Sequence, residues 1–344
     1  MPKVSVVVPV FNAGSYLREC MDSLIRQTLE DIEILCVNDG STDGSPAVLR
    51  EYAAKDPRVR VADQPNGGYG KAMNAGMDMA AGEYTGIVEP DDYVSPEMFE
   101  TLYAAAKAHD LDWVKADYDR FTDGEDGKRN FTRVRLSGRE ADYERVFRPM
   151  DEKDSFLFVM NTWAGIYKTD FLRKNGIRHN ETPGASFQDN GFWFQTLLYA
   201  ERAMLTEASL YRVRRDNPNS SVHNPGKVYA MNREYDWIRA KLEADPALWD
   251  EMKEIYWRLR IRNCWATLRR IAPEARKEYT AAVKAEIRAA KAAGECDPAA
   301  FPPEDRRMAE EITRNSALFR AGRAAAGLPG RLMNAVRKEG KQRL

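Results

Sequence analysis

The first part of the chain alternates short apolar runs with segments in which apolar residues recur at helical spacing. The apolar runs are 4–10, 32–37, 59–61 and 84–88, and the helical segments between them are 14–28, 43–55 and 70–80. Short β-branched runs predict strands that are buried on both faces of a sheet. Strands and helices that alternate in this way predict βαβ units with right-handed crossovers and a parallel sheet.

Polar or turn-forming residues follow each of these four expected strands. They occupy positions 9–12, 38–41, 63–66 and 89–92. The carboxyl ends of parallel strands meet at one edge of the sheet, and ligands collect beyond that edge. We therefore expect these four stretches to line one binding site.

Three carboxylates, Glu89, Asp91 and Asp92, fall within four positions after the fourth strand. They repel one another, and a bound divalent cation would relieve that repulsion. Hard oxygen ligands suit Mg²⁺ or Mn²⁺, which complete their shells with water and substrate phosphates. The alternative is a solvated acidic turn ahead of a helix, since Ser95-Pro96-Glu97 supplies an N-cap, a proline at N1 and a first-turn acid.

After residue 95 the strict alternation ends. We expect a helix at 96–109, a strand at 113–116, a hairpin or loop at 119–138, a strand at 161–167 and a helix at 170–174. Four further helices are expected at 228–242, 252–271, 281–293 and 309–318.

Five motifs in register give the chain a family resemblance. They are VSVVVPVFN at 4–12, DSL at 22–24 with QT at 27–28, VNDGSTDGS at 37–45, NGG at 66–68 and NAG at 74–76. Together they resemble family 2 glycosyltransferases of the GT-A fold. The resemblance implies an α/β fold with a mostly parallel central sheet, and an inverting transferase that uses a nucleotide-diphospho-sugar, UDP-linked in our interpretation. It also implies that the acidic cluster is the metal-binding "DXD" element, with Glu89 where Asp is usual.

The same resemblance assigns candidate site residues. Asp91 and Asp92 would bind Mn²⁺ or Mg²⁺. The residues that would contact the nucleotide sugar are Pro9, Phe11, Asn12, Asp39, Asn66, Lys71, Glu89, Asp91, Arg214 and His223, with Ser220 as a further contact.

Two of these candidates have ordinary structural alternatives. Asp39 could accept the imide N–H of uracil or simply form an Asx-turn. Lys71 could supply charge to the diphosphate, where relatives carry an arginine at the position of Met73, or be a solvated lysine. The glycine-rich segment 67–71 looks like a phosphate loop but matches neither Walker nor GxGxxG spacing.

The candidate general base is Asp189. Relatives carry an acidic pair at the start of a helix at this distance from the metal motif, and Gln188-Asp189 takes that place here. Inversion requires a carboxylate that removes the proton from the acceptor hydroxyl. The alternative is that Asp189 is only a helix N-cap, which Asn could replace without loss.

Charge is balanced overall but uneven along the chain. The net charge of the 344 residues is −1, and the isoelectric point near 6.4 argues against a general binder of polyanions, so we expect no nucleic-acid partner. From 314 onward there are eight Lys or Arg and one Glu, with apolar residues between them. This tail predicts either peripheral contact with an anionic membrane or a solvated basic segment.

The expected organisation is a GT-A domain at 1–225 and a helical appendage with the basic tail at 226–344. Residues 1–95 would bind the donor, and 96–225 would bind the acceptor, a surface glycan or a lipid-linked glycan. No signal peptide and no run of about 18 apolar residues is visible, so we expect a cytoplasmic protein, at most peripheral at the inner face of the plasma membrane, and a homodimer in our interpretation. The alternatives are a non-catalytic nucleotide-sugar-binding protein or a nucleotidyltransferase; a dehydrogenase is disfavoured because 9–14 lacks the close-approach glycines.

Overall fold

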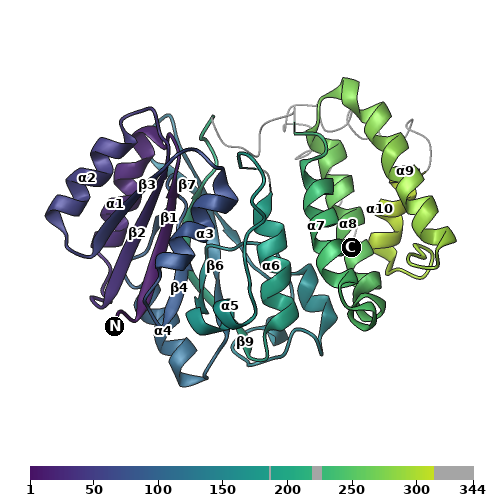
Figure 1. The fold of residues 1–344 in the computed structure, drawn as a ribbon, viewed down its shortest axis with the longest axis horizontal. Coiled ribbons are helices and arrows are strands. Elements are labelled where there is room, and N and C mark those ends of the chain that lie inside the picture. The colour runs from purple at the N-terminus through teal and green to yellow at the C-terminus, as the bar shows by residue number, and fades with distance from the viewer. Residues whose placement is uncertain (186, 219–226, 314–344) are drawn as a thin grey trace, which may run out of the picture. The chain divides into compact units, whose positions relative to one another are not determined.

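The computed structural model describes residues 1–185, 187–218 and 227–313. The chain divides into two compact units, Met1–Trp249 and a second unit from Asp250. The first contains the whole sheet, and the second is helical (Figure 1). The division falls within helix α8 (Pro246–Arg270), so helix α7 (Ala230–Glu243), which packs on α6 (Gln188–Tyr199), belongs to the first unit.

Nine strands form one sheet in the order β3-β2-β1-β4-β8-β6-β9-β5, with β7 paired to β6. The strands are β1 (Val4–Val10), β2 (Ile32–Asp39), β3 (Val59–Gln64), β4 (Tyr84–Ile87), β5 (Tyr93–Val94), β6 (Trp113–Asp123), β7 (Arg129–Val134), β8 (Gly165–Lys168) and β9 (Ala203–Arg214).

Ten α-helices lie in the described ranges. They are α1 (Leu17–Ile25), α2 (Ser45–Lys55), α3 (Tyr69–Met79), α4 (Met98–Ala108), α5 (Thr169–Lys174), α6 (Gln188–Tyr199), α7 (Ala230–Glu243), α8 (Pro246–Arg270), α9 (Arg276–Ala292) and α10 (Pro303–Thr313). Short 3₁₀ turns stand at 14–16, 140–142, 153–157 and 273–275.

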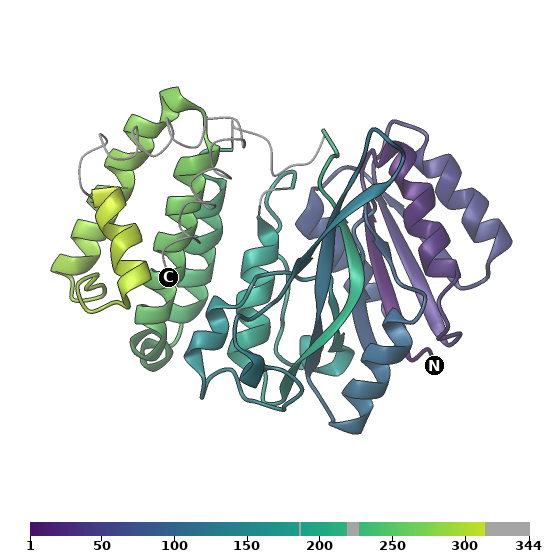
Figure 2. The same cartoon turned by 180° about the vertical axis from the view of Figure 1, so that it is seen from behind.

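The first four strands form the predicted parallel sheet. Val4 of β1 lies opposite Ile32 of β2 on one side and Tyr84 of β4 on the other. Every residue of β1 and β2 is buried, as expected for strands covered on both faces. Helices α1 and α2 cover one face and α3 the other (Figures 1 and 2), the arrangement that right-handed crossovers produce when the strand order reverses.

The second half of the sheet makes it mixed. Strand β8 runs antiparallel to both β4 and β6, so β6 points the same way as β4. β9 is parallel to β6, and the predicted hairpin is β6–β7 (Figure 2). The carboxyl ends of β1, β2, β3, β4, β6 and β9 therefore share one edge of the sheet.

In the second unit, a buried carboxylate joins α10 to α8. Asp305 is fully buried and accepts hydrogen bonds from Arg258, at 2.8 Å, and from Arg262. No helix of the described ranges is long and apolar enough to cross a bilayer. The basic tail, residues 314–344, lies outside the described residues.

Candidate active site

The acidic turn after β4 is anchored from the neighbouring strand β9. The side chain of Asp92 is 4% exposed, and its Oδ1 accepts the backbone N–H of Arg214 at 2.8 Å. The backbone N–H of Glu89 donates to the hydroxyl of Tyr211 at 2.9 Å. The turn is therefore fixed at the shared edge of the sheet and is not a free surface loop.

The carboxylates of this turn carry an electrostatic penalty. Burial first, and then the charges of Asp91 and Asp189, raise the pKa of Glu89 to about 8, although the hydroxyl of Tyr69 donates to its Oε1 at 2.7 Å. Burial and Asp91 likewise raise the pKa of Asp92 well above its usual range. Such a cluster is stabilised by a cation.

The described residues supply only part of a metal shell. They contain no group of three or more His, Cys, Asp or Glu side chains that could enclose an ion. Asp91 keeps carboxylate capacity, because its Oδ2 accepts one hydrogen bond, from Asn217 at 2.8 Å. An open, oxygen-only donor set fits Mg²⁺ or Mn²⁺, which take their remaining ligands from water and substrate phosphates.

Arg214, the last residue of β9, is buried next to the acidic turn. Its side chain is 3% exposed and pairs with Glu19 at 2.7 Å and Asp123 at 2.6 Å. It also pairs with Asp216 at 3.2 Å. The predicted contact between Arg214 and the donor would require these ion pairs to open. His223 and Ser220 lie outside the described residues.

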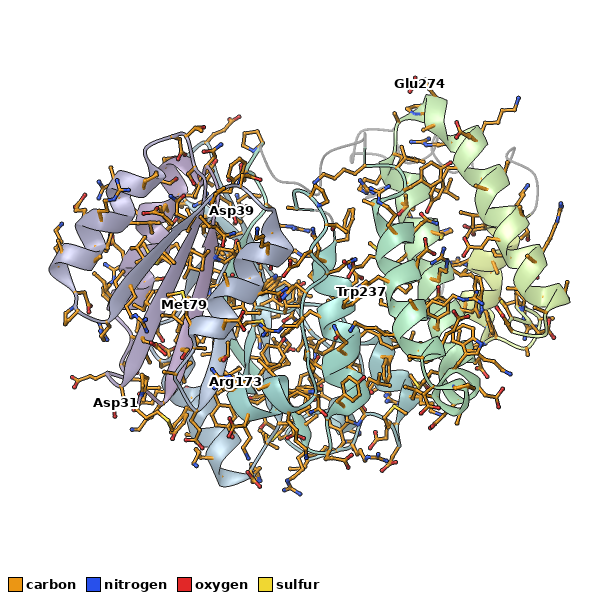
Figure 3. All side chains as sticks on the ribbon, in the orientation of Figure 1. Asp31, Asp39, Met79, Arg173, Trp237 and Glu274 are labelled. Atoms are coloured by element: carbon orange, nitrogen blue, oxygen red, sulfur yellow. The ribbon has the colours of Figure 1, made fainter. Side chains whose placement is uncertain are left out.

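Asp39 stands at the end of β2, on the edge opposite Asp31 (Figure 3). Its Oδ1 accepts Gln64 Nε2 at 2.7 Å and the Gly67 N–H at 2.8 Å, and its Oδ2 accepts the Gly68 N–H at 2.9 Å. A carboxylate offers about four lone-pair sites. Asp39 therefore shapes the 64–68 loop and retains one acceptor position.

The other nucleotide candidates line the same edge. Pro9 is buried within β1, whereas the ring of Phe11 is 50% exposed. Asn12 adopts a left-handed backbone conformation, with φ 49°, and its Oδ1 accepts the N–H of Thr42 at 2.8 Å. Asn66 is exposed beside this loop. Pro9, Phe11, Asn12 and Asn66 thus come together with Asp39 around the ends of β1, β2 and β3.

The glycine-rich segment before α3 is a packing feature. A Cβ on Gly70 would lie 2.1 Å from the carbonyl oxygen of Asn180, and one on Gly68 would lie 2.7 Å from the N of Gly184. The glycines therefore allow the 180–184 segment to lie directly on the start of α3. Lys71 is exposed, and no ion pair of Lys71 occurs among the described residues.

Asp189 is the second residue of α6 and is not its N-cap residue. Phe187 is the N-cap residue, in a left-handed conformation with φ 70°. The N–H of Gly191 is taken by Glu234 of α7, at 3.1 Å. Within the described residues, the Oδ1 of Asp189 accepts the backbone N–H of Asn190 at 3.0 Å and the side-chain Nδ2 of the same residue at 3.1 Å.

Burial raises the pKa of Asp189, and hydrogen bonds from Asn190 partly oppose that rise. Asp189 also influences the pKa of Glu89 and of Tyr69, so it lies near the acidic turn. Both predicted roles of Asp189, general base and helix-end residue, stay predictions, because its Oδ1 accepts the backbone N–H of Asn190 in the first turn of α6.

Sequence reasoning missed two contributors. Tyr69 joins the start of α3 to Glu89, and only its position within the glycine-rich segment could have drawn attention to it. Glu234 lies in the region where the family resemblance fades, and no local signal marks it. Its Oε2 accepts Asn180 Nδ2 at 3.0 Å, which ties α7 to the 180–184 segment.

Comparison with known proteins identifies the family of the chain. The family model "Glycosyl transferase family 2" matches residues 5–176. The chain is 34% identical over 228 residues to the uncharacterized glycosyltransferase EpsJ of Bacillus subtilis, an alignment that spans 66% of this chain and 65% of EpsJ.

Two solved structures share the fold. TarS of S. aureus, residues 1–349 in complex with UDP-GlcNAc, superposes with a TM-score of 0.62 at 20% identity and covers 83% of this chain and 81% of its own. The mannosyltransferase PcManGT of Pyrobaculum calidifontis, in complex with GDP-Man and Mn²⁺, gives a TM-score of 0.51 at 18% identity. That superposition covers 94% of this chain and 80% of PcManGT. The GT-A fold is thereby confirmed, and the chain belongs to glycosyl transferase family 2.

Proposed function

We propose that the protein transfers a sugar from a UDP-linked donor to a hydroxyl of a surface glycan or a lipid-linked glycan, with inversion. Family membership supports a glycosyltransferase that uses a nucleotide sugar. The donor class is supported by TarS, a protein of the same fold that binds UDP-GlcNAc.

The observation that carries the proposal is the position of Asp189. Its carboxylate lies close enough to Glu89 to raise the pKa of that residue, and it is not the N-cap residue of α6. Within the described residues its Oδ1 accepts from Asn190 and forms no ion pair. A carboxyl group with a raised pKa is a better base near neutral pH. In an inverting displacement, such a base takes the acceptor proton while the nucleoside diphosphate departs from the opposite face.

Asp91, assisted by Asp92 and Glu89, would hold Mn²⁺ or Mg²⁺. The bound ion would neutralise charge on the departing diphosphate. Lys71, which is exposed beside the nucleotide candidates, would add a positive charge near the same diphosphate. Asp39 has one acceptor position left for the uracil imide, and Pro9, Phe11, Asn12 and Asn66 would form the walls around the base.

A donor screen tests this function. UDP-, GDP-, TDP- and CMP-sugars are incubated with the protein and Mn²⁺, with and without EDTA, and nucleotide release and binding are measured. We expect UDP release from one donor and its loss in EDTA. Failure of every nucleotide to bind contradicts the proposal, and binding without turnover favours a non-catalytic nucleotide-sugar-binding protein. Release of pyrophosphate would instead identify a nucleotidyltransferase.

A further inference from the structure

Two arginines lie side by side at the same edge of the sheet, on the far side of β4 from the nucleotide candidates. Arg120 is near the end of β6, and Arg215 follows β9 directly. The backbone N–H of Arg215 donates to the carbonyl of Phe121, at 2.9 Å, which continues the pairing of the two strands. Both arginine side chains are exposed.

Neither guanidinium has a carboxylate partner in the part of the chain that the structure describes. Arg120 makes one long hydrogen bond, to the Tyr118 hydroxyl at 3.4 Å. Arg214, one residue before Arg215, is by contrast paired with three carboxylates. Surrounding protein and the charge of Arg120 lower the pKa of Arg215, and the charges of Asp92 and Asp91 in the acidic turn partly oppose this. Two like charges held together in this way favour an anion between them.

An aromatic surface connects these arginines to the acidic turn. Trp163 is partly exposed, and its ring stacks on Tyr211 with centroids 4.5 Å apart. The same ring meets Tyr118 edge-on at 4.6 Å. The hydroxyl of Tyr211 accepts the N–H of Glu89, and the hydroxyl of Tyr118 accepts from Arg120. Trp163 therefore contacts both the tyrosine that touches the acidic turn and the tyrosine that touches the arginine pair. A partly exposed indole is a suitable support for the apolar face of a sugar.

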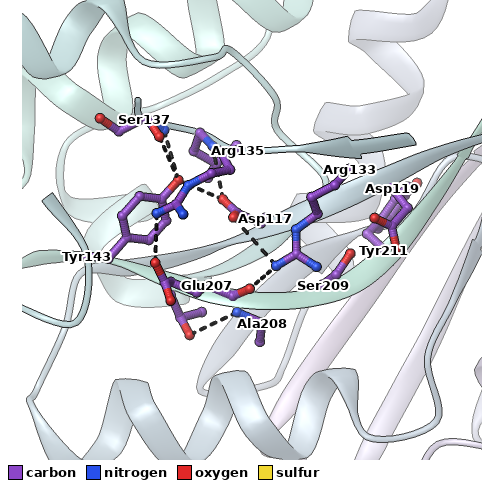
Figure 4. Close-up of polar contacts among 12 residues, drawn as sticks. Asp117, Asp119, Arg133, Arg135, Ser137, Tyr143, Glu207, Ala208, Ser209 and Tyr211 are labelled. Carbon is purple, nitrogen blue, oxygen red and sulfur yellow. Dashed lines mark hydrogen bonds and ion pairs between the residues drawn. The ribbon is translucent and has the colours of Figure 1, made fainter. Parts of the chain in front are cut away.

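A buried polar network fixes the direction of the end of β6 (Figure 4). The β6–β9 register shifts on both sides of Asp117, and such bulges redirect the side chains that follow. Asp117 is 1% exposed and accepts the Leu136 N–H at 2.9 Å and the Tyr143 hydroxyl at 2.8 Å. Arg135 lies over the ring of Tyr143, at 4.6 Å. This network gives Tyr118 and Arg120 a defined position.

We propose that Arg120 and Arg215 bind an anionic group of the acceptor, a carboxylate or a phosphate, while Trp163 supports the sugar or polyol that carries it. The inference rests on the proposed transferase function and assigns a chemical class to its acceptor. Guanidinium forks match both oxyanions in geometry. The position of the two arginines also fits an acceptor site. In the sheet, β4 and β8 separate β6 and β9 from β1, β2 and β3, whose ends carry the nucleotide candidates.

Binding of simple acceptor probes tests this assignment. Calorimetry with UDP and Mn²⁺ present compares methyl glucuronide with methyl glucoside, and glycerol 3-phosphate with glycerol. We expect at least one anionic probe to bind about tenfold more tightly than its neutral counterpart, since a charge-assisted hydrogen bond contributes about 1.5–3 kcal/mol. Whichever anion is preferred identifies the acceptor group as carboxylate or phosphate.

Variants locate the preference. Arg120→Gln and Arg215→Gln should each remove most of the preference for the anionic probe over the neutral probe. Both variants should leave the affinity for UDP unchanged. Arg26→Gln, the control, removes an equal charge from an exposed side chain that has no ion pair within the described ranges, and it should have no effect.

Three results would overturn the inference: equal binding of anionic and neutral probes, an equal loss in Arg26→Gln, or a loss of UDP affinity in Arg215→Gln, which would assign that arginine to the donor. Failure of UDP itself to bind would instead reject the proposed function, and the acceptor assignment with it.

Discussion

The contact between α7 and the start of α6 makes a quantitative prediction about pH. The carboxyl group of Glu234 is 1% exposed and receives the Gly191 N–H and the Asn180 amide. Burial first, and then the charge of Asp189, raise its pKa to about 7 from an ordinary 4.5. A group with a raised folded pKa binds its proton more tightly in the native state. The free energy of unfolding therefore falls as the pH rises from the unfolded pKa to the folded one.

The size of this effect follows from the shift. One pKa unit corresponds to about 1.4 kcal/mol, so the rise from 4.5 to about 7 corresponds to roughly 3 kcal/mol. Glu234→Gln cannot ionise and escapes this loss. At low pH the variant should be less stable than wild type by about 1 kcal/mol. The reason is that the glutamine NH₂ group would face the NH₂ group of Asn180, which donates to a carboxyl oxygen of Glu234 in wild type. The stability of the variant relative to wild type should thus reverse in sign between pH 4.5 and pH 8.

Urea denaturation at several pH values measures this difference. Glu243→Gln, at the end of the same helix, is the matched control: its side chain is 43% exposed and pairs with Arg239 at 2.7 Å. Because an exposed ion pair contributes at most about 1 kcal/mol, this variant should show no reversal of sign between the two pH values. A constant difference for Glu234→Gln across the range, or a variant that loses relative stability as the pH rises, would refute the reasoning.

Two further substitutions test buried features of the first unit. Lys115 is fully buried, its amine donates to the Tyr167 hydroxyl at 2.7 Å, and burial lowers its pKa well below the usual range. Wild type therefore loses stability as the pH falls below the ordinary pKa of lysine. Lys115→Met removes this loss, so it should raise the melting temperature more at pH 7 than at pH 10. A larger rise at pH 10 would contradict this. Gly70→Ala, whose Cβ would meet the Asn180 carbonyl at 2.1 Å, should cost about 1–3 kcal/mol in urea denaturation. Gly44→Ala, with open space around it, should cost nothing, and equal losses in both variants would show that this contact is unimportant.

The first half of the fold could be predicted from the sequence because its signals are local. The runs at 4–10 and 32–37 are β-branched and wholly buried, and the polar residues after them mark the carboxyl edge. The hairpin β6–β7 was also predictable from its glycine-containing, charged sequence. The exact pairing of β8 between β4 and β6 depends on contacts between distant residues, which periodicity does not encode.

The site divides in the same way. Asp91, Asp92 and Asp189 stand in motifs, so the sequence could name them as candidates. It could not show that Arg214 is enclosed by carboxylates while Arg215 is exposed, because adjacent arginines differ only in which face of the strand they occupy. Nor could it show what surrounds Asp189, since the start of α6 is held by Glu234, which comes from α7 and accepts the Gly191 N–H.

The role of Asp189 is the central claim, and Asp189→Asn tests it most directly. The asparagine keeps an oxygen for the hydrogen bonds from Asn190 but cannot accept a proton. With the donor found in the screen and its acceptor, kcat should fall by about 10²–10⁴, while the UDP affinity stays at its wild-type value. The melting temperature at pH 7 should be no lower than that of wild type, because the variant loses a carboxylate whose pKa burial raises. A variant that transfers sugar at the wild-type rate would contradict the proposed mechanism.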